Sequence, residues 1–158
     1  MCALPREAGK EEALKKLHWF LIPSVFFADR LLKIWVLHHL SEAQSVPLWP
    51  NVFHLTRVNN TGAAFGLWRG APAGLAVFSA VSVVLILGYL GRPGARVSQA
   101  ASWALVAGGA LGNLYDRVRF GYVVDFLDLR VWPVFNFADA CITLGVAWIL
   151  YKYASHSS

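Results

Sequence analysis

The run AGLAVFSAVSVVLILGYLG, residues 73–91, contains no charged side chain along its whole length. About 20 mostly apolar residues carry an α-helix across the hydrocarbon core of a bilayer, because each residue advances the helix by about 1.5 Å. Three further windows of comparable length lie at residues 18–40, 97–115 and 134–154. The sequence therefore predicts an all-α membrane protein with four transmembrane helices.

The composition of the chain agrees with this prediction. Of its 158 residues, 57% are hydrophobic and 15% are charged, and the mean hydropathy is +0.50; soluble domains contain about 25% charged residues. We expect residues 1–158 to form a single integral-membrane domain. The segment 41–72, between the first and second windows, is too polar to span the bilayer and too apolar to be fully solvated. It predicts a small β-like element on the extracytoplasmic surface.

The net charge of +5 comes from basic residues near helix ends rather than from an independent basic face. This distribution indicates contact with membrane lipids and not with nucleic acid. Basic residues precede the first window, fill the turn between the second and third, and follow the fourth: Arg6, Lys10, Lys15, Lys16, Arg92, Arg96 and Lys152. Because basic loops stay in the cytoplasm, we expect a multi-pass protein with both termini cytoplasmic.

The stretch VVDFLDLRVWPVFNFADACITLGV, residues 123–146, places acidic residues in apolar surroundings. Asp139 is expected about 7 to 8 Å below the start of the fourth window, at about 1.5 Å per residue. Asp125 lies on the apolar run before that window. Asp116 and Asp128 lie in or beside the same segment. Any two of these four acids that meet in a low-dielectric pocket cannot both ionise comfortably, so one keeps a proton and the pair offers an acid and a base, as in aspartic peptidases. Asp128, beside Arg130, is expected to be a surface acid instead.

Other classes of chemistry lack their motifs. The chain has no HExxH, no GxSxG and no glycine pattern for phosphate or dinucleotide binding, and its five histidines are scattered. We therefore expect no metal and no cofactor. The residues alone leave two functions open, an aspartic hydrolase and a small proton-coupled carrier that uses buried acids as a relay. Four short windows without inverted repeats argue against the carrier, and two acids in shallow membrane argue against a non-catalytic lipid-binding factor.

Two further patterns concern the helices. Asp29 and Lys33 are four residues apart, so they share a face of the first helix and either support a site or simply neutralise each other. The third window carries small residues at intervals of four, which predicts close approach of another helix. These residues are Ala100, Ala104, Gly108 and Gly112.

Three blocks together resemble a known family. They are NNTGAAFG at 59–66, GGALGNLYDRVRFGYVVDF at 108–126 and FNFADACITLG at 135–145. In this order, and with four windows, they are similar to signal peptidase II, the lipoprotein signal peptidase of bacteria, over about residues 26–145. The resemblance implies a four-helix aspartic endopeptidase of the bacterial cytoplasmic (inner) membrane, with its active site on the extracytoplasmic side. Its substrates would be prolipoproteins, cut on the amino-terminal side of a cysteine that carries a diacylglyceryl group.

The resemblance also implies which residues form the site. Asp125 and Asp139 would be the catalytic pair. Residues that would bind substrate or support the pair are Asp29, Lys33, Asn60, Gly62, Asn113, Asp116, Arg117, Asn136 and Ala138. The chain departs from the family at Arg30, where glutamine is usual after the first-helix acid, and at Gly66, where serine is common. No partner for Arg30 can be named from the sequence.

Overall fold

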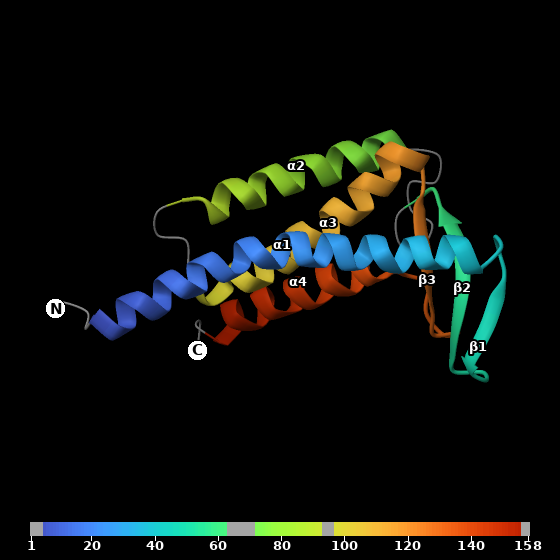
Figure 1. The fold of residues 1–158 in the computed structure, drawn as a ribbon, viewed down its shortest axis with the longest axis horizontal. Helices are drawn as coiled ribbons and strands as arrows, with labels where there is room; N and C mark the ends of the chain where they lie inside the picture. Colours follow the sequence, from blue (N-terminus) through green and yellow to red (C-terminus); the bar gives the residue numbers. More distant parts are fainter. Residues whose placement is uncertain (1–4, 63–71, 93–96, 156–158) are drawn as a thin grey trace.

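The computed structural model describes residues 5–62, 72–92 and 97–155. Along the chain, the elements are α1 (Pro5–His39), β1 (Ser45–Trp49), β2 (Phe53–Asn60), α2 (Pro72–Leu90), α3 (Val97–Phe120), β3 (Val123–Asp128) and α4 (Phe137–Ser155). The helices run side by side and the strands gather at one end of them, while both chain termini lie at the other end (Figure 1). The end that carries the sheet holds the carboxylates of interest.

Helix α3 is the centre of the bundle and packs against α1, α2 and α4. Glycines on α3 make these contacts close: a Cβ atom at Gly108 would lie 2.8 Å from the backbone oxygen of Ile22, and one at Gly112 would lie 2.5 Å from Oδ2 of Asp29. Ala104 is fully buried in the same interface. The predicted stripe of small residues is confirmed as a helix-packing face.

The number of helices agrees with the sequence prediction, but their polarity differs. In the described part of the chain, only one helix, at Ala73–Leu90, is long and apolar enough to cross a membrane by length and composition. Helices α1 and α3 also carry buried polar and charged side chains, among them Asp29, Lys33 and Asp116. Large apolar side chains of α2 and α4, such as Phe78, Leu85, Leu144 and Leu150, are exposed on the outside.

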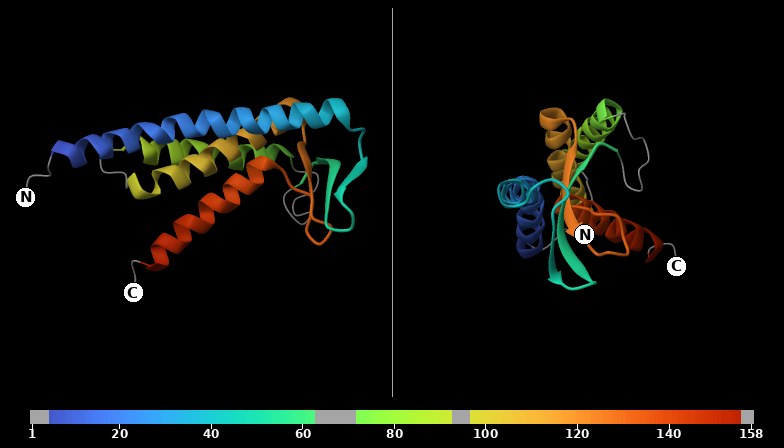
Figure 2. Two further views of the ribbon diagram at one scale, coloured as in Figure 1. Left: turned by 60° about the horizontal axis from the view of Figure 1, so that its bottom comes forward. Right: turned by 90° about the vertical axis from the view of Figure 1, so that its right-hand side faces the viewer.

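Three antiparallel strands form one sheet in the order β1-β2-β3. The two strands of the segment 41–72 confirm its predicted β character; residues 63–71, which include Gly66, lie outside the described part of the chain. The third strand was not predicted, because its run of apolar residues was assigned to a connecting segment. Val124 and Phe126 of β3 are buried against Val36 and Leu40 of α1, and this contact fixes the sheet to the bundle. Figure 2 shows the sheet standing across the ends of the helices.

Two local features bring β3 and the start of α4 together. Helix α3 ends at Phe120. The next residue, Gly121, donates its N–H to the oxygen of Arg117 at 3.0 Å and adopts a φ of 77°, a conformation that glycine adopts without strain. After β3, the chain folds back so that Leu127 and Phe135 exchange backbone hydrogen bonds of 2.7 and 3.0 Å. The strand that carries Asp125 therefore lies beside the helix that carries Asp139.

Helix α4 begins at Phe137 and not at residue 134, which corrects the predicted depth of Asp139. The side chain of Asn136 caps the helix: its Oδ1 accepts the N–H of Asp139 at 2.9 Å, and Oδ2 of Asp139 accepts the N–H of Asn136 at 3.3 Å. This reciprocal pair is a capping box. Asp139 consequently lies in the first turn of α4, at the end of the helix near the sheet. The helix begins late because Phe135 pairs with Leu127 of β3 instead of extending it.

Candidate active site

Asp125 is held by two side-chain amides. Asn60 of β2 donates to its Oδ2 at 2.8 Å, and Asn136 donates to its Oδ1 at 2.6 Å. The side chain is almost fully buried, and β3 presents it opposite Val58 of the neighbouring strand. Amides orient a carboxylate without supplying a full positive charge, so they fix the group and leave it able to hold a proton.

Asp139 receives its donors from two other elements. Asn113 of α3 donates to its Oδ1 at 2.7 Å, and the backbone N–H of Asn136 reaches its Oδ2. Asn136 therefore contacts both aspartates, one with its side chain and one with its backbone. The Oδ1 of Asn113 in turn accepts hydrogen bonds from Lys33 at 3.0 Å and from Asn136 at 3.1 Å.

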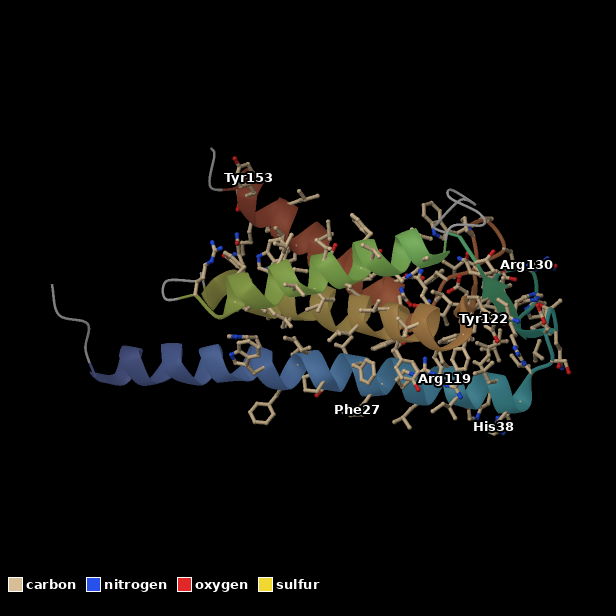
Figure 3. All side chains as sticks on the ribbon, turned by 90° about the horizontal axis from the view of Figure 1, so that it is seen from above. Phe27, His38, Arg119, Tyr122, Arg130 and Tyr153 are labelled. Atoms are coloured by element: carbon tan, nitrogen blue, oxygen red, sulfur yellow. The ribbon has the colours of Figure 1, made fainter. Side chains whose placement is uncertain are left out.

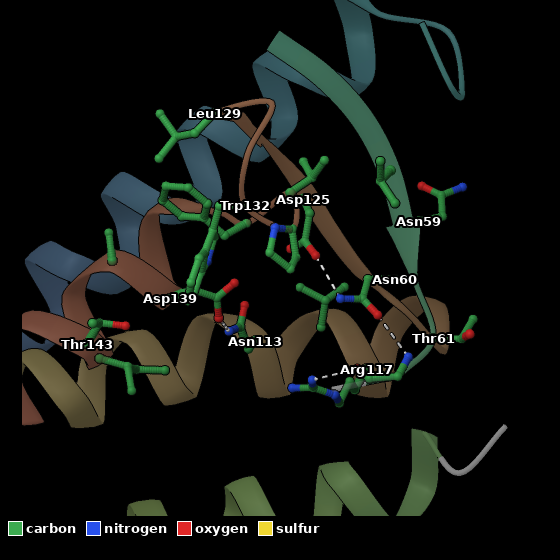
Figure 4. Close-up of a pocket in the computed structure, with 18 of the residues that line it drawn as sticks. Asn59, Asn60, Thr61, Asn113, Arg117, Asp125, Leu129, Trp132, Asp139 and Thr143 are labelled. Atoms are coloured by element: carbon green, nitrogen blue, oxygen red, sulfur yellow. Dashed lines mark hydrogen bonds between the residues drawn. The ribbon is translucent and has the colours of Figure 1, made fainter. Parts of the chain in front are cut away.

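Both aspartates line one cavity of about 1160 Å³ (Figure 4). Its polar wall includes Asn60, Asn113 and Arg117, and Nη2 of Arg117 lies 3.5 Å from the oxygen of Gly62. Gly62 is fixed in turn, because its N–H donates to Oδ1 of Asn60 at 2.9 Å. Asn60, Gly62, Asn113, Arg117 and the two aspartates, which the family resemblance names, thus lie around one space.

The opposite wall of the cavity is apolar, and the sequence did not identify it. It comprises Leu129, Trp132, Pro133, Val134, Phe135, Ile142 and Leu144. Leu129, Trp132 and Pro133 belong to a segment that was treated as a connection, and only its aromatic and proline content could have marked it. Val134 and Phe135 were assigned to the fourth window. Leu144 is also 65% exposed on the outside of α4, so the cavity adjoins the apolar outer surface of the bundle.

The electrostatics of Asp125 favour a shared proton. Burial and, next, the nearby charge of Asp139 raise the pKa of Asp125 to about 7, although the hydrogen bonds from Asn60 and Asn136 and the charge of Lys33 act in the opposite direction. Near neutral pH the carboxyl group is therefore about half protonated. A pair of carboxylates that titrate together in this way can supply one acid and one base at the same time.

Asp29 and Lys33 do more than neutralise each other. Their ion pair measures 2.8 Å, and neither side chain is exposed. Asp29 also accepts the backbone N–H of Ala138 at 3.1 Å, in the first turn of α4, and Lys33 lies 2.8 Å from Asp116. Ala138 is fully buried, and a Cβ at Gly109 would lie 2.5 Å from its backbone oxygen. The pair therefore contacts the helix that bears Asp139.

The prediction for Asp128 is half right. It forms the expected ion pair with Arg130 at 3.0 Å, but its side chain is only 7% exposed, so it is not a surface acid. It is buried because β3 places it beside Thr56, which donates to it at 2.8 Å. Although burial alone would raise its pKa, the hydrogen bonds from Thr56 and Arg130 lower it below the usual value. Asp128 therefore stays ionised at neutral pH, unlike Asp125.

In the parts of the chain that the structure describes, no group of three or more histidine, cysteine or acidic side chains is arranged to hold a metal ion. The polar side chains that line the cavity include two carboxylates, three amides and one guanidinium.

A family model described as signal peptidase (SPase) II matches residues 21–155. The chain belongs to the signal peptidase II family. The lipoprotein signal peptidase of Halothermothrix orenii is 40% identical over 84% of this chain and 91% of that protein. The lipoprotein signal peptidase of Moorella thermoacetica is 46% identical, over 81% and 86% of the two chains.

Solved structures agree with this signal peptidase II assignment. A structure described as a bacterial membrane enzyme superposes with a TM-score of 0.84 over 90% of each chain, at 25% identity. A second structure with the same description gives a TM-score of 0.78, also at 25% identity. Signal peptidase II enzymes are aspartic peptidases, so the chain is a membrane peptidase, and the carrier function is not favoured.

Proposed function

We propose that this enzyme removes the signal peptide from prolipoproteins on the amino-terminal side of a diacylglyceryl-modified cysteine, with Asp125 and Asp139 as the catalytic pair. One observation carries the proposal. Two carboxylates from different elements, the buried Asp125 and the partly buried Asp139, are held by Asn60, Asn113 and Asn136 and line the same cavity. Lipoprotein signal peptidase is also the name of the relatives that match most of the chain.

The pair activates water by general acid–base catalysis. The ionised aspartate takes a proton from water as the water oxygen attacks the scissile carbonyl, and the protonated aspartate donates its proton to the carbonyl oxygen. When the C–N bond breaks, the first aspartate gives its proton to the leaving amine, and the second aspartate takes a proton back from a hydroxyl of the tetrahedral intermediate as the new carboxyl group forms. One aspartate is then ionised and the other protonated, as at the start. Asn60, Asn113 and Asn136 keep both carboxylates in place, and Arg117 lies where it can hold the substrate backbone or a lipid headgroup.

The apolar wall of the cavity favours the proposal that the substrate carries a lipid. Trp132, Ile142 and Leu144 continue from the cavity to the outer surface of α4. A diacylglyceryl group could thus stay in contact with apolar side chains and lipid while the adjacent peptide bond reaches the aspartates, so that the acyl chains are never transferred into water.

We further propose that all four helices cross the cytoplasmic membrane, with both termini in the cytoplasm and the sheet on the outer side. Both termini lie at the end of the bundle opposite the sheet (Figure 1), close to the predicted cytoplasmic basic residues. Tyr153 also lies at that end, far from Arg130 at the sheet (Figure 3). Interfacial tyrosine and tryptophan side chains are typical of helix ends at the membrane surface.

The proposal is tested by incubating the purified enzyme with a diacylglyceryl prolipoprotein and with the same precursor lacking the lipid. We expect cleavage of the lipidated form only, with mass spectrometry locating the new amino terminus at the modified cysteine. Equal rates on the two precursors would contradict the substrate assignment, and no cleavage of either would contradict the proposed function.

A further inference from the structure

Arg30 has a buried partner that the sequence did not disclose. Its guanidinium forms an ion pair with Oδ1 of Asp116 on α3 and lies 4.5 Å from the centre of the Tyr115 ring. The arginine side chain is 9% exposed, and Asp116 is fully buried. A planar guanidinium suits this position because it can stack on the aromatic ring and pair with a carboxylate at the same time.

Arg30 completes a cluster of four charged side chains. In order of contact they are Asp29, Lys33, Asp116 and Arg30. Lys33 alone would face two carboxylates and leave one negative charge without compensation. With Arg30, two cations balance two anions. Removing one partner from such a buried network leaves an uncompensated charge in a low-dielectric environment.

The two anions of the cluster hold the two elements that carry the aspartates. Oδ2 of Asp116 accepts the backbone N–H of Val124 at 3.2 Å, one residue before Asp125 on β3. Oδ1 of Asp29 accepts the N–H of Ala138 at 3.1 Å, one residue before Asp139. A change in the charge or position of either anion is therefore transmitted to the residue adjoining an aspartate.

We propose that Arg30 is a positioning residue for the reaction: by pairing with Asp116 it keeps the cluster electrically neutral and holds β3 so that Asp125 meets Asp139. This inference rests on the proposed function. Arg30, which stands where the family commonly has glutamine, would thereby help to set the pH range in which this enzyme is active.

The charges that face Asp125 indicate how that range should respond. These charges are Asp139 on α4, Lys33 on α1 and Arg117 on α3. From β2, Asp125 faces only the neutral amide of Asn60. The charge of Lys33 already reaches Asp125, so a change in the charge of its cluster should reach it as well. Extra negative charge favours the protonated form of an acid, and extra positive charge favours its ionised form.

The test compares the pH dependence of kcat/KM for cleavage of a lipidated precursor. Arg30→Gln gives the cluster a net charge of minus one, so we expect the alkaline limb to move up by roughly half a pH unit to one unit. Asp116→Asn gives a net charge of plus one and should move the limb down. The double variant Arg30→Gln/Asp116→Asn is neutral again, and its limb should return to the wild-type position.

Two further variants separate the effect of the charge from other effects of a substitution. Arg30→Lys keeps the charge and should leave the limb at the wild-type pH. Arg119→Gln removes an exposed arginine near the same end of α3 (Figure 3) that takes no part in the ion pairs of the cluster, and it should leave the limb at the wild-type pH. For Arg30→Gln we also expect kcat to fall about tenfold with little change in KM, because the contact positions a catalytic group rather than the substrate.

Several results would overturn the inference. An unshifted limb in Arg30→Gln would do so, as would an equal shift in Arg119→Gln. If Arg30→Gln does not fold, Asp116→Asn and the double variant decide, and the inference is wrong if their limbs coincide. Carbon-13 NMR titration of the Asp125 carboxyl group follows the same shift without catalysis. A wild-type enzyme that cleaves normally while the variants show no shift refutes only this inference, whereas a wild-type enzyme without cleavage refutes the proposed function.

Discussion

Replacing Asn136 by alanine removes three contacts at once. The side chain donates to Asp125 at 2.6 Å and to Asn113 at 3.1 Å, and it accepts the N–H of Asp139 at 2.9 Å as the cap of α4. Loss of a helix cap costs about 1 kcal/mol. Loss of a buried hydrogen bond to a carboxylate costs about 1.5 to 3 kcal/mol. The variant should therefore remain folded but lose both stability and order at the active site.

The loss at Asp125 has a definite direction. The hydrogen bond from Asn136 lowers the pKa of Asp125 from what burial and Asp139 would otherwise produce. Without it the pKa should rise above about 7, by roughly one unit, since 1.4 kcal/mol corresponds to one unit. We expect the alkaline limb of the kcat/KM profile to move up by that amount, and kcat at neutral pH to fall about 10- to 100-fold.

The matched control is Asn136→Ser, because serine caps a helix but cannot reach Asp125 as the longer amide does. It keeps the cap but loses the contact to Asp125, so its free energy of unfolding should lie about 1 kcal/mol above that of Asn136→Ala and still below that of the wild type. Its pH profile should resemble that of Asn136→Ala. The reasoning is refuted if Asn136→Ala keeps the wild-type profile, or if serine restores both stability and profile, since the amide contact to Asp125 would then have no effect.

Three further predictions concern stability and cofactors. Gly112→Ala should destabilise the fold by about 1 to 3 kcal/mol because the new methyl group would lie 2.5 Å from Oδ2 of Asp29; unchanged thermal unfolding would contradict the packing. Since the pKa of Asp125 is raised from 3.8 to about 7, the unfolded chain releases this proton at lower pH than the folded chain does. The free energy of unfolding of the wild type should therefore fall as the pH rises between these two pKa values, and this group should cause no further fall at higher pH. In Asp125→Asn the free energy of unfolding should fall by a few kcal/mol less over the same interval. Incubation with a chelator should leave cleavage unchanged, and loss of activity that zinc restores would refute a metal-free mechanism.

The sequence predicted the elements of this fold better than their ends. Long apolar runs predicted the helices. Small residues at intervals of four predicted the face of α3 that other helices approach closely, because helical periodicity is a local property of the chain. The start of α4 was placed at 134 because an apolar run does not reveal that Phe135 pairs with Leu127 of β3 instead of joining the helix. Strand β3 was missed for a related reason, since a strand that is buried on both faces shows no alternation.

The candidate site was predicted in a similar way. Apolar surroundings favoured Asp139 as a functional acid. The family resemblance then selected Asp125 as its partner and supplied the three asparagines. Neither could disclose that Asp128 is buried or that Arg30 pairs with Asp116, because these contacts join residues far apart in the chain: Thr56 with Asp128, and α1 with α3. Such pairings depend on the tertiary fold and leave no local pattern.

The central claim is that Asp125 and Asp139 act as one catalytic pair. The most direct test measures single-turnover cleavage of a lipidated precursor by Asp125→Asn and by Asp139→Asn. Each variant should fold as the wild type does, bind the precursor, and cleave it about 10²- to 10⁴-fold more slowly or not at all, while Asp128→Asn, a change of the same kind on the same strand as Asp125, should cleave at close to the wild-type rate. A wild-type rate in either Asp125→Asn or Asp139→Asn would contradict the account.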